Sequence, residues 1–240
     1  MKVVVIISAD GEWSALKTLL GAAVIETTRF GEKLDRSIEG RPLTFFHGGW
    51  GKVSAAASTQ FVIDQFRPDL IVNLGTCGGF RGRIERGTIV LVHRTLIYDI
   101  VELMGSAEQA IQHYSTSLDL SWLSEPPPSP VHRGLLVSGD RDVIAESIPK
   151  LISNYDAVAA DWESGAIAWV AGRNGQRLLI LRGVTDLVGE EGGEAYGNYQ
   201  LFLHRARDVM GTLIAILPVW LNAFEGALGE RASQTSGKAL

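Results

Sequence analysis

The sequence predicts an α/β fold: a three-layer αβα sandwich with a mostly parallel central sheet. Two observations predict it. Strand-like apolar runs alternate with helix-like segments along the 240 residues. The most apolar run, at 177–186, is typical of a central strand buried on both faces. No repeat or linker divides the chain, so we expect a single domain over 1–228 and a polar, mobile tail at 229–240.

The expected elements follow one another closely. The opening run of Val and Ile is too short for a signal peptide and is followed directly by Asp10 and Glu12, so it predicts a first strand. Runs of the same kind predict further strands, and longer mixed segments between them predict helices. The strands are expected at 3–9, 43–48, 69–74, 88–93, 134–138, 157–160 and 178–185, and the helices at 12–20, 53–66, 162–171 and 199–221, with a Gly-rich turn at 75–79 and an irregular stretch at 104–130.

Composition excludes several classes of protein. The net charge is −5 and no block of Lys or Arg stands out, so we expect no nucleic-acid partner. The single cysteine, Cys77, forms no disulfide within the chain and suits a reducing cytoplasm. The longest apolar stretch is interrupted by Pro218 and Asn222, which argues against a membrane span. The five histidines lack ligand spacing, so neither a metal nor a cofactor is expected.

Acidic residues lie at two predicted strand ends. Asp186 ends the apolar run, and the carboxyl end of a central strand borders the ligand crevice of an open α/β sheet. A carboxylate there is a candidate acid or base, although an N-cap is the commoner role after a strand. Glu12 follows the first strand, where a helix first-turn acid is the alternative.

Two further segments carry candidate binding residues. The glycines at 75–79 allow backbone N–H groups to approach a ligand, or simply form a tight turn. Glu163 is expected in the first turn of a helix capped by Asp161. Its carboxylate could accept hydrogen bonds from the two hydroxyls of a sugar diol. The alternative is a surface residue stabilised by the helix dipole. The chain has no dinucleotide fingerprint and no Gly-x-Ser-x-Gly elbow.

Seven segments, taken in order, resemble the purine nucleoside phosphorylase/uridine phosphorylase superfamily, and most closely its methylthioadenosine/S-adenosylhomocysteine nucleosidases. They cover residues 1 to about 190 at near-family spacing, and they are Ile6-Ile-Ser-Ala-Asp-Gly-Glu12, Gly49-Trp-Gly-Lys-Val-Ser-Ala-Ala56, Asn73-Leu-Gly-Thr-Cys-Gly-Gly79, Gly87-Thr-Ile-Val90, Val137-Ser-Gly-Asp140, Asp161-Trp-Glu163 and Arg182-Gly-Val-Thr-Asp186. The resemblance implies a mixed, mostly parallel sheet of the nucleoside phosphorylase kind, a nucleoside substrate and a homodimer.

The resemblance also implies roles. Asp186 matches the general acid that protonates N7 of a purine, Glu12 the residue that activates water, and Glu163 the residue that binds the ribose hydroxyls. Further matches are expected at the substrate, namely Thr76, Gly78, Val143 and Trp162, and in support of the carboxylates, namely Arg182 and Ser138. Together they imply cleavage of an N-glycosidic bond, in which acid and base help is typically worth roughly 10²–10⁴-fold.

The residues present favour water over phosphate as the nucleophile. Phosphate is usually held by arginines, and the phosphorylases carry an Arg where this chain has Asn73. Asp10 and Glu12 in the first loop would repel phosphate. Hydrolysis of a methylthioadenosine-like or related adenosine substrate is therefore expected. A phosphorylase, a futalosine-type hydrolase and a non-catalytic nucleoside-binding relative are the alternatives.

The chain departs from the nucleosidase pattern in three places, one of which is the middle segment 98–104. Trp162 stands where these enzymes usually have Met before the ribose glutamate. They also usually carry an aromatic residue soon after Val-Ser-Gly-Asp to stack on adenine, whereas here Asp140 is followed by Arg141, Asp142 and Val143. These departures concern the base and the 5′ group. The irregular apolar segment at 97–104 is a candidate source of partner contacts.

Overall fold

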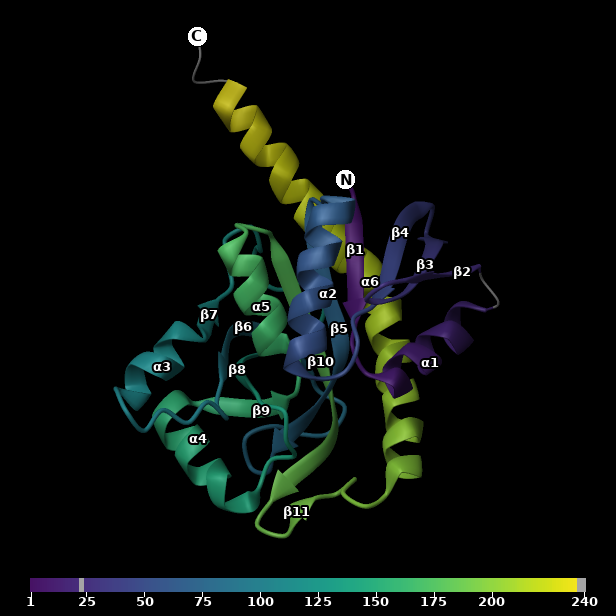
Figure 1. The fold of residues 1–240 in the computed structure, drawn as a ribbon. Helices are drawn as coiled ribbons and strands as arrows, with labels where there is room; N and C mark the ends of the chain where they lie inside the picture. Colours follow the sequence, from purple (N-terminus) through teal and green to yellow (C-terminus); the bar gives the residue numbers. More distant parts are fainter. Residues whose placement is uncertain (22–23, 237–240) are drawn as a thin grey trace.

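A computed structural model describes residues 1–21 and 24–236 of the chain, with side chains as far as Glu230 (Figure 1). The helices are α1 (Asp10–Leu20), α2 (Gly51–Phe66), α3 (Ala107–His113), α4 (Ile148–Tyr155), α5 (Ser164–Arg173) and α6 (Tyr199–Ser236). The strands are β1 (Val3–Ile7), β2 (Ile25–Thr28), β3 (Gly31–Ile38), β4 (Arg41–His47), β5 (Leu70–Phe80), β6 (Ile89–Ile97), β7 (Ser115–Ser117), β8 (His132–Ser138), β9 (Ala157–Asp161), β10 (Leu178–Gly189) and β11 (Gly192–Gly193).

The strands form one mixed sheet in the order β11-β10-β6-β8-β9-β5-β1-β4-β3-β2, with β7 beside β6. Its centre is parallel: β4 pairs with β1, β1 with β5, and β5 with β10. Because β10 pairs with both β5 and β6, the strands β5, β10, β6, β8 and β9 close into a ring. The αβα prediction with a mixed sheet is confirmed, and half of the sheet is in addition curled into a small barrel.

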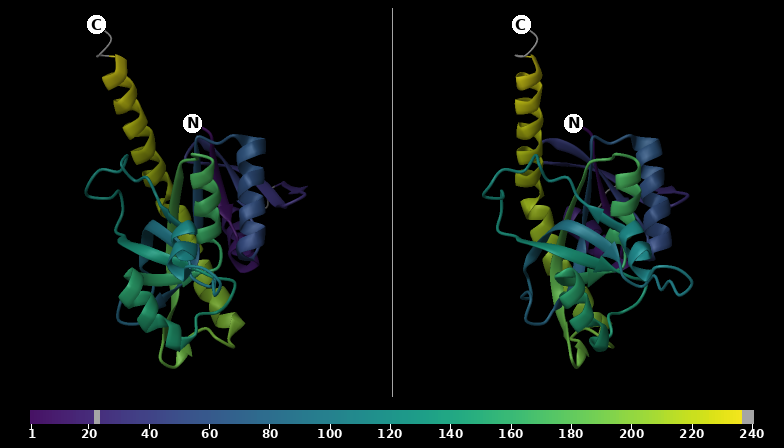
Figure 2. Two further views of the ribbon diagram at one scale, coloured as in Figure 1. Left: turned by 60° about the vertical axis from the view of Figure 1, so that its left-hand side comes forward. Right: turned by 90° about the vertical axis from the view of Figure 1, so that its left-hand side faces the viewer.

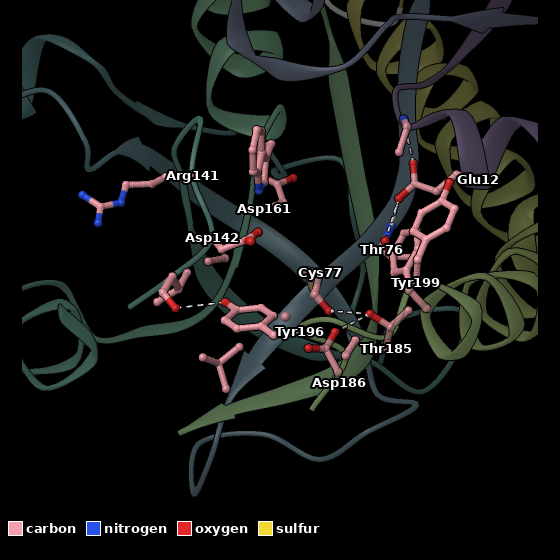
Figure 3. Close-up of a pocket in the computed structure, with 18 of the residues that line it drawn as sticks. Glu12, Thr76, Cys77, Arg141, Asp142, Asp161, Thr185, Asp186, Tyr196 and Tyr199 are labelled. Atoms are coloured by element: carbon pink, nitrogen blue, oxygen red, sulfur yellow. Dashed lines mark hydrogen bonds between the residues drawn. The ribbon is translucent and has the colours of Figure 1, made fainter. Parts of the chain in front are cut away.

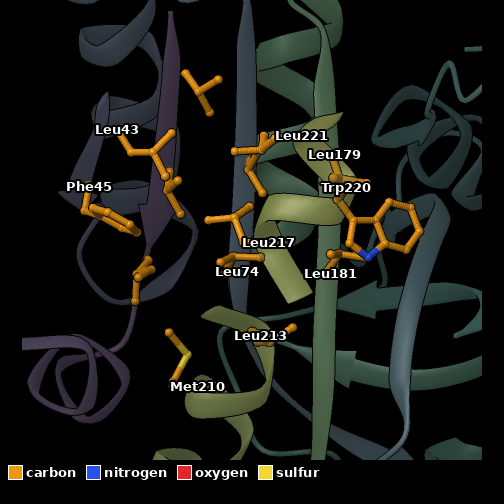
Figure 4. Close-up of a cluster of buried hydrophobic side chains, with 14 of the residues drawn as sticks. Leu43, Phe45, Leu74, Leu179, Leu181, Met210, Leu213, Leu217, Trp220 and Leu221 are labelled. Carbon is orange, nitrogen blue, oxygen red and sulfur yellow. The ribbon is translucent and has the colours of Figure 1, made fainter. Parts of the chain in front are cut away.

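Helices cover both faces of the sheet. On one face, α1 and α6 pack on β1, β4, β5 and β10, and Leu213, Leu217 and Trp220 of α6 are fully buried there (Figure 4). On the other face, α2 and α5 pack over a second cluster. The five residues of β1 are apolar and fully buried, as the opening Val-Ile run predicts. Gly183 of β10 lets α6 approach, since a Cβ there would lie 2.3 Å from Val209 Cγ1.

Several elements differ from the prediction. The Gly-rich segment 75–79 is not a turn, because β5 continues through it to Phe80. Strand β10 likewise runs past the predicted end at 185 and contains Asp186. The hairpin of β2 and β3 was missed because its residues are mostly polar and exposed. Helix α4 was missed as well, and the irregular stretch contains α3 and β7. Helix α5 begins at Ser164 instead of 162.

Helix α6 is longer than predicted. It continues through Pro218 to Ser236, beyond the body of the protein, so the tail expected from Gly229 is helical as far as Ser236 (Figure 2). The last four residues, 237–240, lie outside the described residues. By length and composition its segment Tyr199–Glu230 is apolar enough to cross a membrane, contrary to the sequence prediction. Of the apolar window, 44% is buried inside the protein, and one helix of this length and composition is weak evidence for a membrane span.

Candidate active site

A cavity of about 520 Å³ opens beside β5, β9 and β10, at the start of α2 and α6 (Figure 3). Seven of the nine predicted site residues and the flanking Asp161 line it. The seven are Glu12, Thr76, Gly78, Val143, Trp162, Glu163 and Asp186. Glu12 and Asp186 therefore lie in the wall of the same cavity. Ser138 and Arg182 are fully buried behind the cavity wall.

Glu12 is held by donors on one of its oxygens. Its Oε1 accepts hydrogen bonds from the Thr76 backbone N–H at 2.5 Å and the Thr76 hydroxyl at 2.7 Å. Its Oε2 receives only the longer bond from Ala9 N, at 3.3 Å. The first turn of α1 places this carboxylate, and the side chain is only 2% exposed. Glu12 is thus fixed through one oxygen, and the other is available to a bound water.

Arg182 is the cation that holds the carboxylates together. Its guanidinium lies 3.0 Å from Asp161 Oδ2 and 3.7 Å from Glu12 Oε1. It also donates to Asn73 Oδ1 at 3.0 Å and Ser164 Oγ at 2.8 Å. A fully buried Arg is favourable only with such partners. Proximity to the carboxylates keeps the pKa of Arg182 raised, so it stays charged.

Ser138 supports the same network from β8. Its hydroxyl donates to Asp161 Oδ1 at 2.5 Å and accepts from the Gly165 N–H at 2.8 Å. Asp161 in turn accepts from the Ser164 N–H at 3.2 Å, which satisfies one of the free N–H groups at the start of α5. The predicted capping by Asp161 is present, but Glu163 is itself the N-cap residue of α5 and does not lie in its first turn.

Glu163 is buried at the cavity wall, so the alternative of an exposed surface residue is wrong. Its Oε1 accepts a hydrogen bond from Gly51 N at 3.0 Å. Burial, reinforced by the nearby Asp161, raises the pKa of Glu163 to about 8. Above it, the rings of Trp50 and Trp162 stack with centroids 4.9 Å apart. The Trp162 departure from the family pattern is thus one half of an aromatic pair at the cavity mouth.

Asp186 lies at the other end of the cavity. The pairing of β10 with β5 shifts register between Val184 and Asp186, and this irregularity turns the side chain into the cavity. Its Oδ1 accepts from the Thr185 hydroxyl at 2.8 Å. Burial raises the pKa of Asp186 above its ordinary value. A carboxyl group that keeps its proton to higher pH in a cavity is suited to donate that proton.

The glycines of β5 serve close approach rather than a turn. A Cβ on Gly75 would lie 2.0 Å from Arg182 Nη1 and 2.8 Å from Glu12 Oε1. Only a residue without a side chain lets the guanidinium and the carboxylate meet over the strand. Gly78, opposite Asp186 in the adjoining strand, lines the cavity.

Sequence reasoning missed the aromatic lining. Tyr196, Tyr199 and Phe202 reach the cavity from the loop before α6 and from its first turn, and Trp50 reaches it from the start of α2. A signal was available, since aromatic residues follow the Asp186 strand after a Gly-rich loop. No group of three His, Cys, Asp or Glu side chains among the described residues is placed to hold a metal ion.

Comparison with known proteins agrees with this geometry. A family model described as the phosphorylase superfamily matches residues 3–217. A 5′-methylthioadenosine/S-adenosylhomocysteine nucleosidase of Bacillus subtilis is 26% identical over 221 residues, which cover 86% of this chain and 93% of the relative. A nucleosidase of the same name from Maridesulfovibrio salexigens is 29% identical over 171 residues, covering 66% and 74% of the two chains.

Solved structures share the fold. The Neisseria meningitidis nucleosidase in complex with methylthio-immucillin-A has a TM-score of 0.71 at 22% identity, covering 90% of this chain and 99% of that one. The Helicobacter pylori enzyme with butyl-thio-DADMe-Immucillin-A has a TM-score of 0.75 at 17% identity, covering 92% and 98%. Because the family model matches most of its length, the chain belongs to the phosphorylase superfamily.

Proposed function

We propose that this protein hydrolyses the N-glycosidic bond of a purine nucleoside, 5′-methylthioadenosine, S-adenosylhomocysteine or a related adenosine derivative. The observation that carries the proposal is the pair of carboxyl groups, Glu12 and Asp186, in one cavity with opposite environments. Glu12 is saturated with hydrogen-bond donors on one oxygen, and burial raises the pKa of Asp186 above its ordinary value. Two carboxyl groups with different environments supply a base and an acid.

The reaction follows from their placement. Asp186 gives its proton to the leaving base at N7, so that the base departs neutral. Glu12 takes a proton from the water that attacks the sugar carbon, while Glu163 accepts hydrogen bonds from the ribose hydroxyls. Negative charge on Glu12 beside the sugar also stabilises an oxocarbenium-like transition state. The bond between sugar and base breaks, the water oxygen bonds to the sugar carbon, and base and free sugar leave.

Water is favoured over phosphate by the charges around the cavity. Its described lining contains five carboxyl groups and one Arg, the exposed Arg141. Asn73, at the position of the phosphorylase arginine, is fully buried. It donates to Ile6 O at 3.1 Å and accepts from Arg182, so it is committed to the interior. An anionic nucleophile would have to enter beside these acidic groups, with only the exposed Arg141 in the described lining to attract it.

We also propose that the protein is a cytoplasmic homodimer. Large apolar side chains are exposed on two segments. One carries Trp50, just before α2, and Val53 of α2, and the other carries Val101, Leu103 and Met104. The ion pair between Lys52 and Asp99 joins these segments. Asp140 Oδ1 accepts a hydrogen bond from the Lys52 backbone N–H, and the Asp140 backbone N–H donates to Asp99 Oδ2. An exposed apolar patch next to a cavity mouth is typical of a surface covered by a partner. A free buried Cys77 suits a reducing compartment.

The proposal is tested by incubating the protein with a nucleoside panel, with and without phosphate, and identifying the base and sugar released. We expect adenine from 5′-methylthioadenosine at a rate independent of phosphate. Asp186→Asn should lower kcat by at least about 10²-fold with little change in ligand affinity, because the proton is needed only in the transition state.

A second substrate isolates the proton. Cleavage of a 4-nitrophenyl riboside releases 4-nitrophenolate, a stable anion that needs no proton to leave. The Asp186→Asn variant should therefore cleave this substrate nearly as fast as the wild type does. Glu190→Gln removes an exposed carboxylate from the turn that follows β10 and should leave both rates unchanged. An Asp186→Asn enzyme that turns over the natural nucleoside at the wild-type rate would show that Asp186 is structural.

A further inference from the structure

Five aromatic rings line the cavity, and four of them are already paired with one another. Trp50 stacks on Trp162, and Tyr199 stacks on Phe202 with centroids 5.9 Å apart. Within the described part of the chain, Tyr196 has no ring partner of this kind, and 42% of its surface is exposed. An unpaired aromatic face on a cavity wall is a platform for another flat ring.

The Tyr196 ring is fixed at both ends. Its hydroxyl donates to the Val143 carbonyl oxygen at 2.9 Å, and its backbone N–H donates to Gly193 O at 3.0 Å. The ring lies on the backbone of Gly193, since a Cβ there would come within 2.4 Å of Tyr196 Cε1. The ring is therefore held in place before any ligand arrives, which lowers the entropy cost of stacking on it.

The position of the ring matches the end of the cavity where the base is released. Figure 3 shows Tyr196 between Asp142 and Asp186, far from the Glu12 end, where Tyr199 lies. Burial and the nearby Asp142 and Asp186 carboxylates raise the pKa of Tyr196, so its hydroxyl stays neutral. A base protonated by Asp186 would occupy the part of the cavity that this ring lines.

The segment bonded by Tyr196 is the one that lacks an aromatic residue. Arg141, Asp142 and Val143 follow Asp140 and provide no ring. Tyr196 brings a ring to this segment from a different element, the loop between β11 and α6. We propose that Tyr196 is the platform on which the purine base stacks, a binding and specificity role that the sequence motifs do not reveal. The inference rests on the proposed function.

Inhibition by the two products separates base binding from sugar binding. In Tyr196→Ala, the inhibition constant of free adenine should rise by about tenfold to a hundredfold, the usual range for loss of one stacking aromatic. In the same variant, the inhibition constant of 5-methylthioribose should stay within about twofold of the wild-type value. Tyr196→Phe keeps the ring and should stay within about fivefold of the wild type for adenine. Tyr196→Leu keeps apolar bulk without the ring and should behave like Tyr196→Ala.

The controls make the result decisive. Ile144→Ala changes an exposed apolar residue beside Val143 that does not line the cavity, and it should alter neither constant. Unchanged adenine inhibition in Tyr196→Ala, or equal weakening of both products, would overturn the inference. If the wild type neither cleaves nucleosides nor binds adenine, the proposed function fails instead. The two failures are therefore distinguishable.

Discussion

At the scale of single residues, the site separates carboxyl groups by what surrounds them. Glu12 is held by the N–H and hydroxyl of Thr76, and Asp161 by Arg182 and Ser138. Glu163 has only one backbone donor, from Gly51, and burial raises its pKa. Glu163 therefore holds its proton to higher pH than an ordinary glutamate does, because the effect of burial outweighs that of its one hydrogen-bond donor.

This difference predicts how stability depends on pH. The pKa of Glu163 is about 8 in the folded protein and 4.5 in its ordinary state. Between these values the folded state holds a proton that the unfolded state has released. The contribution of Glu163 is therefore fully present below about pH 4.5, decreases as pH rises, and is lost above about pH 8. Urea unfolding over this range should show the free energy of unfolding falling with pH.

The Glu163→Gln variant identifies the source of that slope. Glutamine does not titrate, so the slope should become shallower, and Asp186, whose pKa is also raised by burial, still contributes in the same direction. Glu190→Gln is the matched control, because its carboxylate is exposed, and the slope should persist. A wild-type slope in Glu163→Gln would show that another group holds the proton.

At the scale of elements, β5 explains what the sequence could and could not predict. Apolar runs located β1, β5 and β10, and acidic residues near their ends located Glu12 and Asp186. Gly75–Gly79 looked like a turn, because glycine in sequence does not reveal whether it serves a turn or a close contact. Tyr196 was missed because it acts from a loop whose position depends on the folded β10–β11 pairing.

The role of Gly75 in β5 gives a sharp prediction. In Gly75→Ala, the methyl group would overlap the Arg182 guanidinium, 2.0 Å away, and push it away from Glu12. Overpacking of this kind typically costs about 1–3 kcal/mol. We expect a loss of kcat/KM of about 10²-fold or more, since displacements near 1 Å in an active site have effects of this size. Steady-state kinetics and thermal unfolding measure the two effects.

Helix α6 supplies the control for this variant. A Cβ on Gly211 would come no closer than 3.9 Å to Leu19, which is ordinary contact. Gly211→Ala should therefore keep full activity and gain about 0.5–1 kcal/mol of stability, as Ala does in a helix interior. If Gly75→Ala keeps the wild-type kcat/KM, the side chains of Arg182 and Glu12 can move apart without loss of activity, and the prediction is wrong.

At the scale of the whole molecule, the cavity mouth and the exposed apolar patch are continuous through Trp50. This residue stacks on Trp162 at the cavity and is 64% exposed. Met104 and Leu103, at the other side of the patch, are 100% and 88% exposed. Side chains of this size are rarely left in contact with water over a connected surface. The patch is the surface through which the proposed homodimer would form.

The dimer is tested by charging the patch. Leu103→Asp and Met104→Asp place carboxylates on it and should convert a dimer into a monomer in sedimentation velocity at micromolar concentration. Val219→Asp puts the same charge on an exposed apolar position of α6 and should leave the dimer intact. A wild-type protein that sediments as a monomer, or a dimer that is unaffected by the patch variants, would contradict the proposal.

The ring of strands also determines when the protein can fold. Strand β10 closes the ring by pairing with β5 and β6, for example Leu178 with Ile71. Parallel partners this far apart in the chain form slowly, because the intervening segment must first be ordered. On the ribosome, Glu12 and Thr76 emerge long before Asp186, so a chain that stops short of β10 leaves β5 with an open edge. Synthesis of β10, rather than formation of the first helices, is therefore the step after which the edge of β5 is protected from pairing with other chains.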